Sequence, residues 1–351
     1  MNILEKKIVN NGRQNELDIA KGLAILFMIA VHIQSELGEA SVSTTIIGGL
    51  VNFLGTIPAA PVFMFLLGTG IVFSKKSDPK TLIKRGIKII GLGYLLNILR
   101  TIIVFLPLML FGDISKYTNE LIVSIVNIDI LQFAGLAFVF FGVIKKINLK
   151  LNHMVILVNI ISILNYILLK FQIENYIIAA IIGLFWGANE LSAFPFATWI
   201  FYPVAGFFFG EILIRQENKD VFYKKIQFVF AILLCILIVI AYKFSINSGL
   251  MTEVSYYHHT LFSNILFTSF VLVWISALFH IKKFIPDLVQ TVLKRWSLNV
   301  NSIYIIHWII ISILGATMGF YSLSFECTIL ALIITIILSD IAAVFFRKLK
   351  G

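Results

Sequence analysis

Long apolar runs separated by short polar segments make up most of this chain. A helix needs about 20 mainly apolar residues to cross about 30 Å of hydrocarbon, and the runs are of that order. We therefore predict an all-α fold, a polytopic bundle of about ten transmembrane helices. The predicted spans cover 17–34, 46–73, 89–111, 120–144, 153–169, 196–214, 226–244, 261–281, 300–317 and 327–346.

One further apolar segment, YIIAAIIGLFWGA at 176–188, is too short to be predicted as a full crossing. It is better interpreted as a half-helix or a re-entrant segment, whose irregular ends must be covered by protein rather than lipid. The loops between the predicted spans are short and there is no soluble appendage. We therefore expect residues 1–351 to form a single membrane domain.

The distribution of positive charge predicts the orientation of these spans, because Lys and Arg accumulate in cytoplasmic loops. If the N-terminus is inside and 176–188 does not cross, all but four of the 28 Lys and Arg residues fall in cytoplasmic segments. Both termini are then cytoplasmic. The net charge of +10 is explained by topology and by contact with anionic lipids, without nucleic acid. The four exceptions are Arg100, Lys116, Lys170 and Lys243.

Composition agrees with a membrane location, since 59% of residues are hydrophobic and only 13% are charged. The two cysteines, Cys235 and Cys327, lie in apolar runs without the spacing of metal ligands. We expect them to be packing residues rather than a disulfide. No metal site is predicted.

The first span, DIAKGLAILFMIAVHIQ at 18–34, keeps an acid and a base near one end and a histidine near the other. Lys21 and His32 are eleven residues apart, about three helical turns and about 16 Å, so they share one face. Asp18 lies three residues before Lys21, where the two side chains can pair. Alternatively, Asp18 and Lys21 snorkel to the interface and His32 marks the helix end. The spacing alone leaves both interpretations open.

The wider pattern R-x4-D-x2-K-G-x9-H runs from Arg13 through Asp18, Lys21 and Gly22 to His32. It resembles the opening of the membrane-bound acyltransferase superfamily, which includes acyltransferase family 3 and the heparan-α-glucosaminide N-acetyltransferase-like proteins. Arg is the commoner residue where this chain has Lys21. The exchange keeps the charge but loses the fork that binds a phosphate at two points.

Two more stretches are similar to the same superfamily, IPAAPVFMFLLGTGI at 57–71 and TLIKRGIKIIGLGYLLN at 81–97. The prolines and glycines of the first also suit an ordinary kink with tight helix contacts. In the second, the resemblance implies that Lys84, Arg85 and Lys88 bind the phosphates of coenzyme A. The positive-inside rule alone would also place basic residues there.

A third stretch, NIDILQFAGLAFVF at 127–140, is similar to the heparan-type pattern and contains Asp129 and Gln132 on one face. A carboxylate within hydrocarbon costs about 2.5–3.5 kcal/mol on insertion scales, so Asp129 should face the interior and have a partner. Arg100 is the candidate. A structural ion pair between Arg100 and Asp129 is favoured over direct catalysis, and both interpretations are kept.

The stretch SLNVNSIYIIHWII at 297–310 resembles the closing helix of the family, and FPFATWIFYPVAGFFFGEIL at 194–213 accompanies it. Tyr304 and His307 are three residues apart and would present a hydroxyl and an imidazole inside the bundle. The alternative is a buried structural histidine satisfied by a neighbouring helix.

Taken together, the resemblance implies a transmembrane acyltransferase of a bacterial plasma membrane. It would move an acyl group, most simply acetyl, from cytosolic acyl-CoA to a sugar hydroxyl or amine on an extracytoplasmic glycan. His32 would accept the proton of the attacking group or carry the acyl group covalently. Acetyl-CoA or another acyl-CoA is the implied donor, and no metal is expected. Membrane lipids and a second copy of the chain, in a homo-oligomer, are the other expected partners. The implied residues are catalytic His32, Asp129 and His307, donor-binding Asp18, Lys21, Lys84, Arg85 and Lys88, and substrate-binding Arg100, Gln132 and Tyr304.

A transporter or flippase for a glycan or lipid-linked substrate is the main alternative, because it would also have about ten spans and a few intramembrane charges. It predicts an internal repeat, but the opening pattern does not recur in the second half.

The acceptor of an acyltransferase would bind outer loops such as 246–260. Its aromatic and imidazole side chains fit a sugar site or an interfacial belt, and they are Tyr256, Tyr257, His258 and His259.

Overall fold

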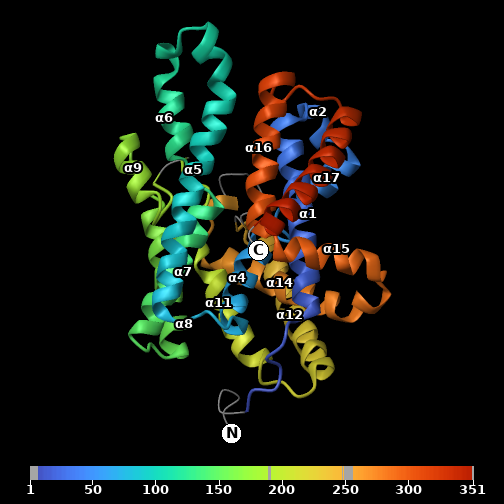
Figure 1. Ribbon diagram of the computed structural model, residues 1–351. Helices are drawn as coiled ribbons and strands as arrows, with labels where there is room; N and C mark the ends of the chain where they lie inside the picture. Colours follow the sequence, from blue (N-terminus) through green and yellow to red (C-terminus); the bar gives the residue numbers. More distant parts are fainter. Residues whose placement is uncertain (1–6, 189–190, 247, 249–255, 350–351) are drawn as a thin grey trace. The chain divides into compact units, whose positions relative to one another are not determined.

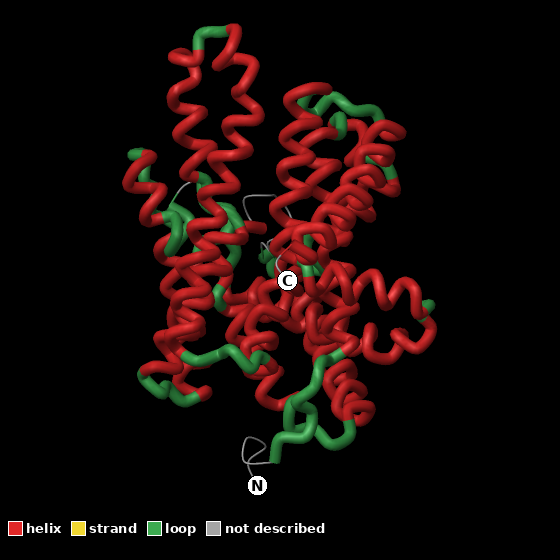
Figure 2. Tube along the Cα trace, in the orientation of Figure 1, coloured by secondary structure: helices red, strands yellow, loops and turns green. Residues whose placement is uncertain are grey.

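The computed structural model describes residues 7–188, 191–246, 248 and 256–349, and within these ranges it contains helices and loops but no β-strand (Figures 1 and 2). The predicted all-α fold is therefore confirmed. Within the described residues, the short 3₁₀ helices η2 (Ile114–Tyr117) and η3 (Lys282–Phe284) join longer elements. The α-helices are α1 (Asn15–Leu37), α2 (Ala40–Ser43), α3 (Ile46–Gly55), α4 (Ala60–Phe73), α5 (Pro79–Phe111), α6 (Thr118–Val126), α7 (Ile130–Lys146), α8 (Leu151–Leu168), α9 (Tyr176–Ile182), α10 (Phe196–Trp199), α11 (Phe201–Leu213), α12 (Lys219–Lys243), α14 (Leu261–Ile281), α15 (Asp287–Leu298), α16 (Val300–Met318) and α17 (Phe325–Leu349).

Eight helical stretches of the described chain are long and apolar enough to cross a membrane, which confirms a polytopic bundle. They are Ile46–Phe73, Pro79–Phe111, Leu151–Leu168, Phe196–Leu213, Lys219–Lys243, Leu261–Phe284, Val300–Met318 and Phe325–Leu349. The predicted span at 17–34 forms α1, whose ends carry several charged residues. The predicted span at 120–144 is not one helix, because the chain breaks before Asp129 caps α7.

The structure also tests the predictions for the short apolar segment at 176–188 and for the two cysteines. The segment predicted as a half-helix forms α9, whose seven residues rise only about 10 Å and cannot cross the hydrocarbon. Cys235 and Cys327 are free, as expected, but both are exposed on helices α12 and α17. The expectation that they pack in the interior is therefore wrong, because their helices present those faces outward.

The chain forms two compact units. Unit 1 comprises Met1–Gln14, Phe63–Leu95 and Val126–Phe279, and unit 2 comprises Asn15–Val62, Leu96–Ile125 and His280–Gly351. Helix α5 contributes its first half to unit 1 and its second half to unit 2.

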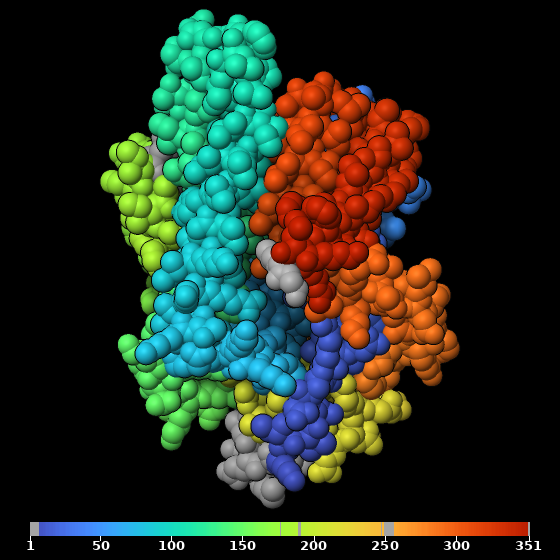
Figure 3. All heavy atoms as spheres, viewed as in Figure 1, coloured from blue at the N-terminus to red at the C-terminus, as the bar shows by residue number. Residues whose placement is uncertain are grey.

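Helix α1 is central to unit 2, where it packs against α3, α15, α16 and α17. α15 crosses the first turns of α1 at backbone contact (Figure 1). A Cβ added to Gly22 would lie 2.6 Å from the carbonyl oxygen of Leu293, so only glycine fits there. α16 and α17 lie side by side and appear as adjoining orange and red surface in Figure 3.

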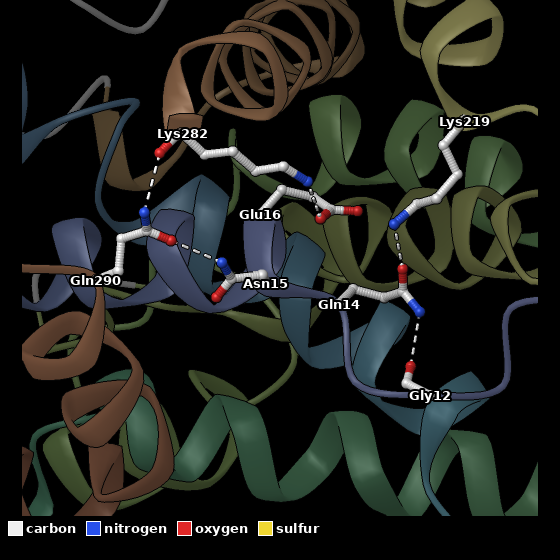
Figure 4. Close-up of polar contacts among 7 residues, drawn as sticks. All are labelled: Gly12, Gln14, Asn15, Glu16, Lys219, Lys282 and Gln290. Carbon is white, nitrogen blue, oxygen red and sulfur yellow. Dashed lines mark hydrogen bonds and ion pairs between the residues drawn. The ribbon is translucent and has the colours of Figure 1, made fainter. Parts of the chain in front are cut away.

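Polar contacts fix the start of α1 within unit 2 (Figure 4). Glu16 is almost fully buried and forms an ion pair with Lys282, at 3.0 Å between Oε2 and Nζ. Asn15 Nδ2 donates to Gln290 Oε1 at 2.8 Å. A buried carboxylate without a partner would cost several kcal/mol, so this pair specifies where α1 meets the segment before α15.

Close glycine contacts also organise unit 1. A Cβ on Gly68 would lie 1.7 Å from the Pro203 carbonyl oxygen, and one on Gly206 would lie 1.8 Å from that of Phe65. α4 and α11 therefore cross backbone to backbone, and Thr69 Oγ1 donates to the Gly206 carbonyl at 2.8 Å. Small residues at the interface allow this approach, as is common between membrane helices. Also in unit 1, Gln14 Nε2 donates a hydrogen bond to the Gly12 carbonyl, and Gln14 Oε1 accepts one from Lys219 Nζ (Figure 4).

The orientation inferred from charge makes a direct prediction about Lys219, at the start of α12. In a background with Cys235 and Cys327 replaced by serine, Lys219→Cys should not react with a membrane-impermeant maleimide in intact cells, because Lys219 lies in a cytoplasmic cluster. Lys116→Cys, in a predicted outer loop, is the matched control and should react. Labelling of Lys219→Cys in sealed cells would reverse the topology of the C-terminal half.

The contact at Gly22 predicts a loss of stability on substitution. Gly22→Ala forces α15 away from α1 and should destabilise the protein by about 1–3 kcal/mol, the usual cost of overpacking. Gly49→Ala on α3 is the control, because nothing lies within 4 Å of a Cβ there. Thermal unfolding of the two purified variants in one detergent measures the difference. Equal melting temperatures would show that the α1–α15 contact can relax.

Candidate active site

Two histidines from distant parts of the sequence meet inside unit 2. His32 lies on α1 and His307 lies on α16, and His32 Nδ1 is 3.0 Å from His307 Nε2. Their rings are nearly parallel, with centroids 5.3 Å apart. His307 is fully buried, whereas His32 is partly exposed. The pair therefore has one fully buried member and one member with part of its surface exposed.

The hydrogen-bond chain fixes which nitrogens carry hydrogen when both rings are neutral. His307 Nδ1 is 3.2 Å from the carbonyl oxygen of Ile303, which can only accept, so Nδ1 carries the hydrogen. His307 Nε2 is then an acceptor, and His32 Nδ1 must donate to it. The Nε2 lone pair of His32 is left to take a proton from another molecule. This is the arrangement of a general base held by an orienting partner.

An aromatic and a cationic side chain complete the site. The Trp308 ring stacks on His32 with centroids 4.5 Å apart, and Arg100 Cζ lies 3.6 Å from the centroid of a Trp308 ring. A guanidinium over an indole face is a favourable cation–π contact. Tyr304 contacts His307 edge to face, with centroids 5.2 Å apart. A permanent positive charge and a tyrosine ring thus lie close to the imidazole pair.

The structure therefore brings together four of the residues predicted from sequence, namely His32, Arg100, Tyr304 and His307. Trp308 was missed, although it follows His307 directly and is four residues after Tyr304, on the same helix face. Its indole Nε1 is buried and has no hydrogen-bond partner within the described residues. A buried indole N–H usually has a hydrogen-bond partner, so this one is available to donate a hydrogen bond to another molecule.

At the other end of α1, Asp18 is buried and its Oδ1 accepts a hydrogen bond from Ser297 Oγ on α15 at 2.8 Å. Asp18 therefore helps to hold α15, a role that the sequence did not predict. Lys21 is partly exposed on the same helix. Pairing of Asp18 with Lys21, and donor binding by either residue, stay predictions.

Asp129 and Gln132 lie in unit 1 and form a capping box at the start of α7. Asp129 Oδ1 accepts from the backbone N–H of Ile130 at 2.6 Å, and Gln132 Oε1 accepts from that of Asp129 at 3.3 Å. These bonds satisfy helix N–H groups that have no intrahelical acceptor. The catalytic role of Asp129, the substrate role of Gln132 and the ion pair with Arg100, which belongs to unit 2, stay predictions.

The basic residues predicted to bind the donor, Lys84, Arg85 and Lys88, are exposed on the first half of α5 in unit 1. Arg85 Cζ lies 4.2 Å from the ring centroid of Phe138 on α7. This is a cation–π contact that positions the guanidinium group at an exposed residue. The arrangement is compatible with phosphate binding and with the positive-inside rule.

The loop residues considered for sugar binding belong largely to the core of unit 1; positions 247 and 249–255 of that loop lie outside the described residues. Tyr256 and His259 are buried. His259 Nε2 lies 2.7 Å from Tyr202 Oη and 2.9 Å from Asn264 Oδ1, and burial lowers the pKa of His259 to about 4. Neutral His259 links α11 to the start of α14. These two side chains therefore do not form an open sugar-binding surface.

Comparison with known families identifies the class of protein to which this helical membrane fold belongs. A family model for the acyltransferase domain matches residues 14–344, nearly the whole chain. The chain therefore belongs to acyltransferase family 3. It is an integral membrane protein and an acyltransferase. No curated protein matches the chain.

The hydrogen-bond chain predicts an unusual tautomer for His32. In the purified protein labelled with ¹⁵N-histidine, neutral His32 should carry its hydrogen on Nδ1. His307→Phe removes the acceptor, so the His32 signals should change toward the Nε2–H form, whereas His153→Phe, at an exposed position on α8, should leave them unchanged. An Nε2–H form of His32 in the unmodified protein would contradict the proposed direction of the hydrogen bonds.

Proposed function

We propose that this membrane acyltransferase moves an acyl group, acetyl in the simplest case, from cytosolic acyl-CoA to a sugar hydroxyl or amine on an extracytoplasmic glycan. The observation that carries the proposal is the hydrogen-bonded pair of His32 and His307. It provides an oriented imidazole nitrogen with a lone pair inside a bundle of the acyltransferase family. Such a group is what deprotonation of a sugar hydroxyl or amine requires.

The reaction follows from these groups. As the acceptor oxygen or nitrogen attacks the thioester carbon, His32 Nε2 takes its proton and the carbonyl oxygen gains negative charge. Arg100, a cation, and the Trp308 N–H, a hydrogen-bond donor without a partner within the described residues, are the groups of this site that can stabilise the oxyanion. When the carbon–sulfur bond breaks, the departing thiolate takes the proton from His32. The products are the acylated acceptor and free coenzyme A.

Direct transfer and an acyl-histidine intermediate use the same nitrogen. In the second route His32 Nε2 attacks the thioester itself, and the acceptor then displaces the imidazole. Radiolabel from acetyl-CoA that stays on the unmodified protein after denaturation, but not on His32→Ala, would support the covalent route.

The donor is proposed to bind from the cytoplasm, with both termini on that side of a bacterial plasma membrane. The exposed charges of Lys84, Arg85 and Lys88 in unit 1 support binding of phosphates, and Lys21 on α1 in unit 2 is a separate candidate for the same role. Along α1, Lys21 and His32 are about 16 Å apart. An extended donor could therefore bind at the inner end and present its acyl group near His32. The transporter alternative loses support because the family is one of transferases.

The proposal predicts that His32→Ala lowers transfer by about 10²–10⁴-fold while the affinity for acyl-CoA is retained, because loss of the base affects the transition state more than donor binding. Purified protein in vesicles is incubated with radiolabelled acetyl-CoA and candidate glycans, and donor binding is measured separately. His153→Ala, at the exposed site on α8, is the control. Undiminished turnover by His32→Ala would exclude His32 as the base.

A further inference from the structure

Unit 1 contains a large open cavity that the proposed reaction does not use. Its volume is 830 Å³, within the range of about 300–1,000 Å³ that is usual for ligand sites. It lies between α8, α11, α12 and α14 and includes one residue of α4, Phe65. We call this cavity the α12 groove, because α12 forms one whole side of it.

The wall of the α12 groove is apolar along most of its length. Aromatic and aliphatic side chains such as Phe208, Val229 and Leu272 line it. Two of its polar wall residues bond to their own helices: Asn159 Nδ2 donates to the Val155 carbonyl at 2.9 Å, and Ser269 Oγ donates to the Ile265 carbonyl at 2.8 Å. The Thr268 hydroxyl oxygen is buried and has no hydrogen-bond partner within the described residues. The groove therefore offers hydrocarbon contacts to an occupant.

One end of the groove differs, because the turn between α11 and α12 and the second turn of α12 are polar. Glu217 and Lys225 line this end and are exposed. Neither forms an ion pair within the described residues, whereas the neighbouring Lys224 is paired with Asp220 at 2.7 Å. This polar end, the mouth of the α12 groove, thus presents a carboxylate and an ammonium group next to the apolar wall.

Helix α12 is covered by little protein in the described structure. Tyr223, near its start, is its one buried residue in the described structure, and the most apolar 18-residue window of α12 has no buried position. By the topology predicted from charge, the polar mouth is at the cytoplasmic headgroup level and the groove leads into the hydrocarbon. A molecule entering from the bilayer would meet the mouth with its head and the wall with its tail.

We infer that the α12 groove is a binding site for a zwitterionic glycerophospholipid of the phosphatidylethanolamine type. One acyl chain lies along the apolar wall, the phosphate pairs with Lys225 and the amine pairs with Glu217. An anionic lipid without an amine would leave Glu217 unpaired beside its phosphate, and a sterol would leave both charges unpaired. The lipid joins α12 to α8, α11 and α14 where protein side chains alone leave space.

The experiment uses the full-length protein, purified in detergent, and native mass spectrometry. Phosphatidylethanolamine and phosphatidylglycerol with identical chains are titrated separately, and the dissociation constant of the first bound lipid is measured. Phosphatidylethanolamine should bind more tightly. Lys225→Ala should weaken its binding about fivefold, the effect of about one headgroup contact, whereas the paired neighbour Lys224→Ala should leave it unchanged.

Two further variants separate head from tail. Glu217→Gln should weaken phosphatidylethanolamine but not phosphatidylglycerol, because only the former carries an amine. Ala205→Phe places a ring in the wall and should weaken both lipids, whereas Ala342→Phe on α17, in unit 2, should weaken neither. If Ala205→Phe does not fold, the two charge variants still decide the question.

Three results would overturn the inference. The first is an unchanged affinity in both Lys225→Ala and Glu217→Gln. The second is tighter binding of phosphatidylglycerol with no response to Glu217→Gln, which would make the groove a site for anionic lipid. The third is displacement of the bound lipid by saturating acetyl-CoA, which would assign the groove to the donor. None of these results depends on the proposed role of His32.

Discussion

The hydrogen bond between His32 and His307 depends on how α1 is held along its length. Near its start, buried Glu16 pairs with Lys282, Asp18 accepts from Ser297, and Gly22 lets α15 approach to backbone contact. Beyond His32, Gln34 Nε2 donates to Asn52 Oδ1 on α3 at 2.7 Å. A shift of one residue along α1 would turn these groups by about 100° and break all of them together. The polar contacts of α1 therefore set the register that places one imidazole against the other.

Much of this arrangement could be predicted from sequence because it rests on length, charge and spacing. The apolar runs identified the helices, and the Lys21–Gly22 and Tyr304–His307 patterns marked α1 and α16. Contact between His32 and His307 could not be predicted, since no local pattern reports which helix faces of distant segments meet. Trp308 was missed for a related reason. An aromatic residue in an apolar run looks the same whether it faces lipid or covers an imidazole.

Two differences arose where a polar residue interrupts an apolar run. Asp129 was expected to need a distant cation because the run at 120–144 looked continuous. In the structure the helix begins after Asp129, whose carboxylate accepts hydrogen bonds from backbone N–H groups at the helix start, and the pairing with Arg100 stays a prediction. Likewise, the imidazole of His259 looked like a loop residue available to a ligand, but buried Tyr202 and Asn264 satisfy it. In both cases the sequence shows that a polar group must be satisfied but not which partner satisfies it.

The imidazole pair ends at the carbonyl oxygen of Ile303, and this has a consequence for energy coupling. A carbonyl oxygen accepts a hydrogen bond but does not carry a proton onward, so the pair has no exit on that side. A proton taken up at His32 must leave from the same nitrogen through which it arrived. In the proposed scheme this proton comes from the outer acceptor and departs on the thiol of cytosolic coenzyme A, so one proton moves inward for each acyl group that moves outward. Because the acyl group replaces that proton on the acceptor, the exchange leaves no net charge on either side of the bilayer.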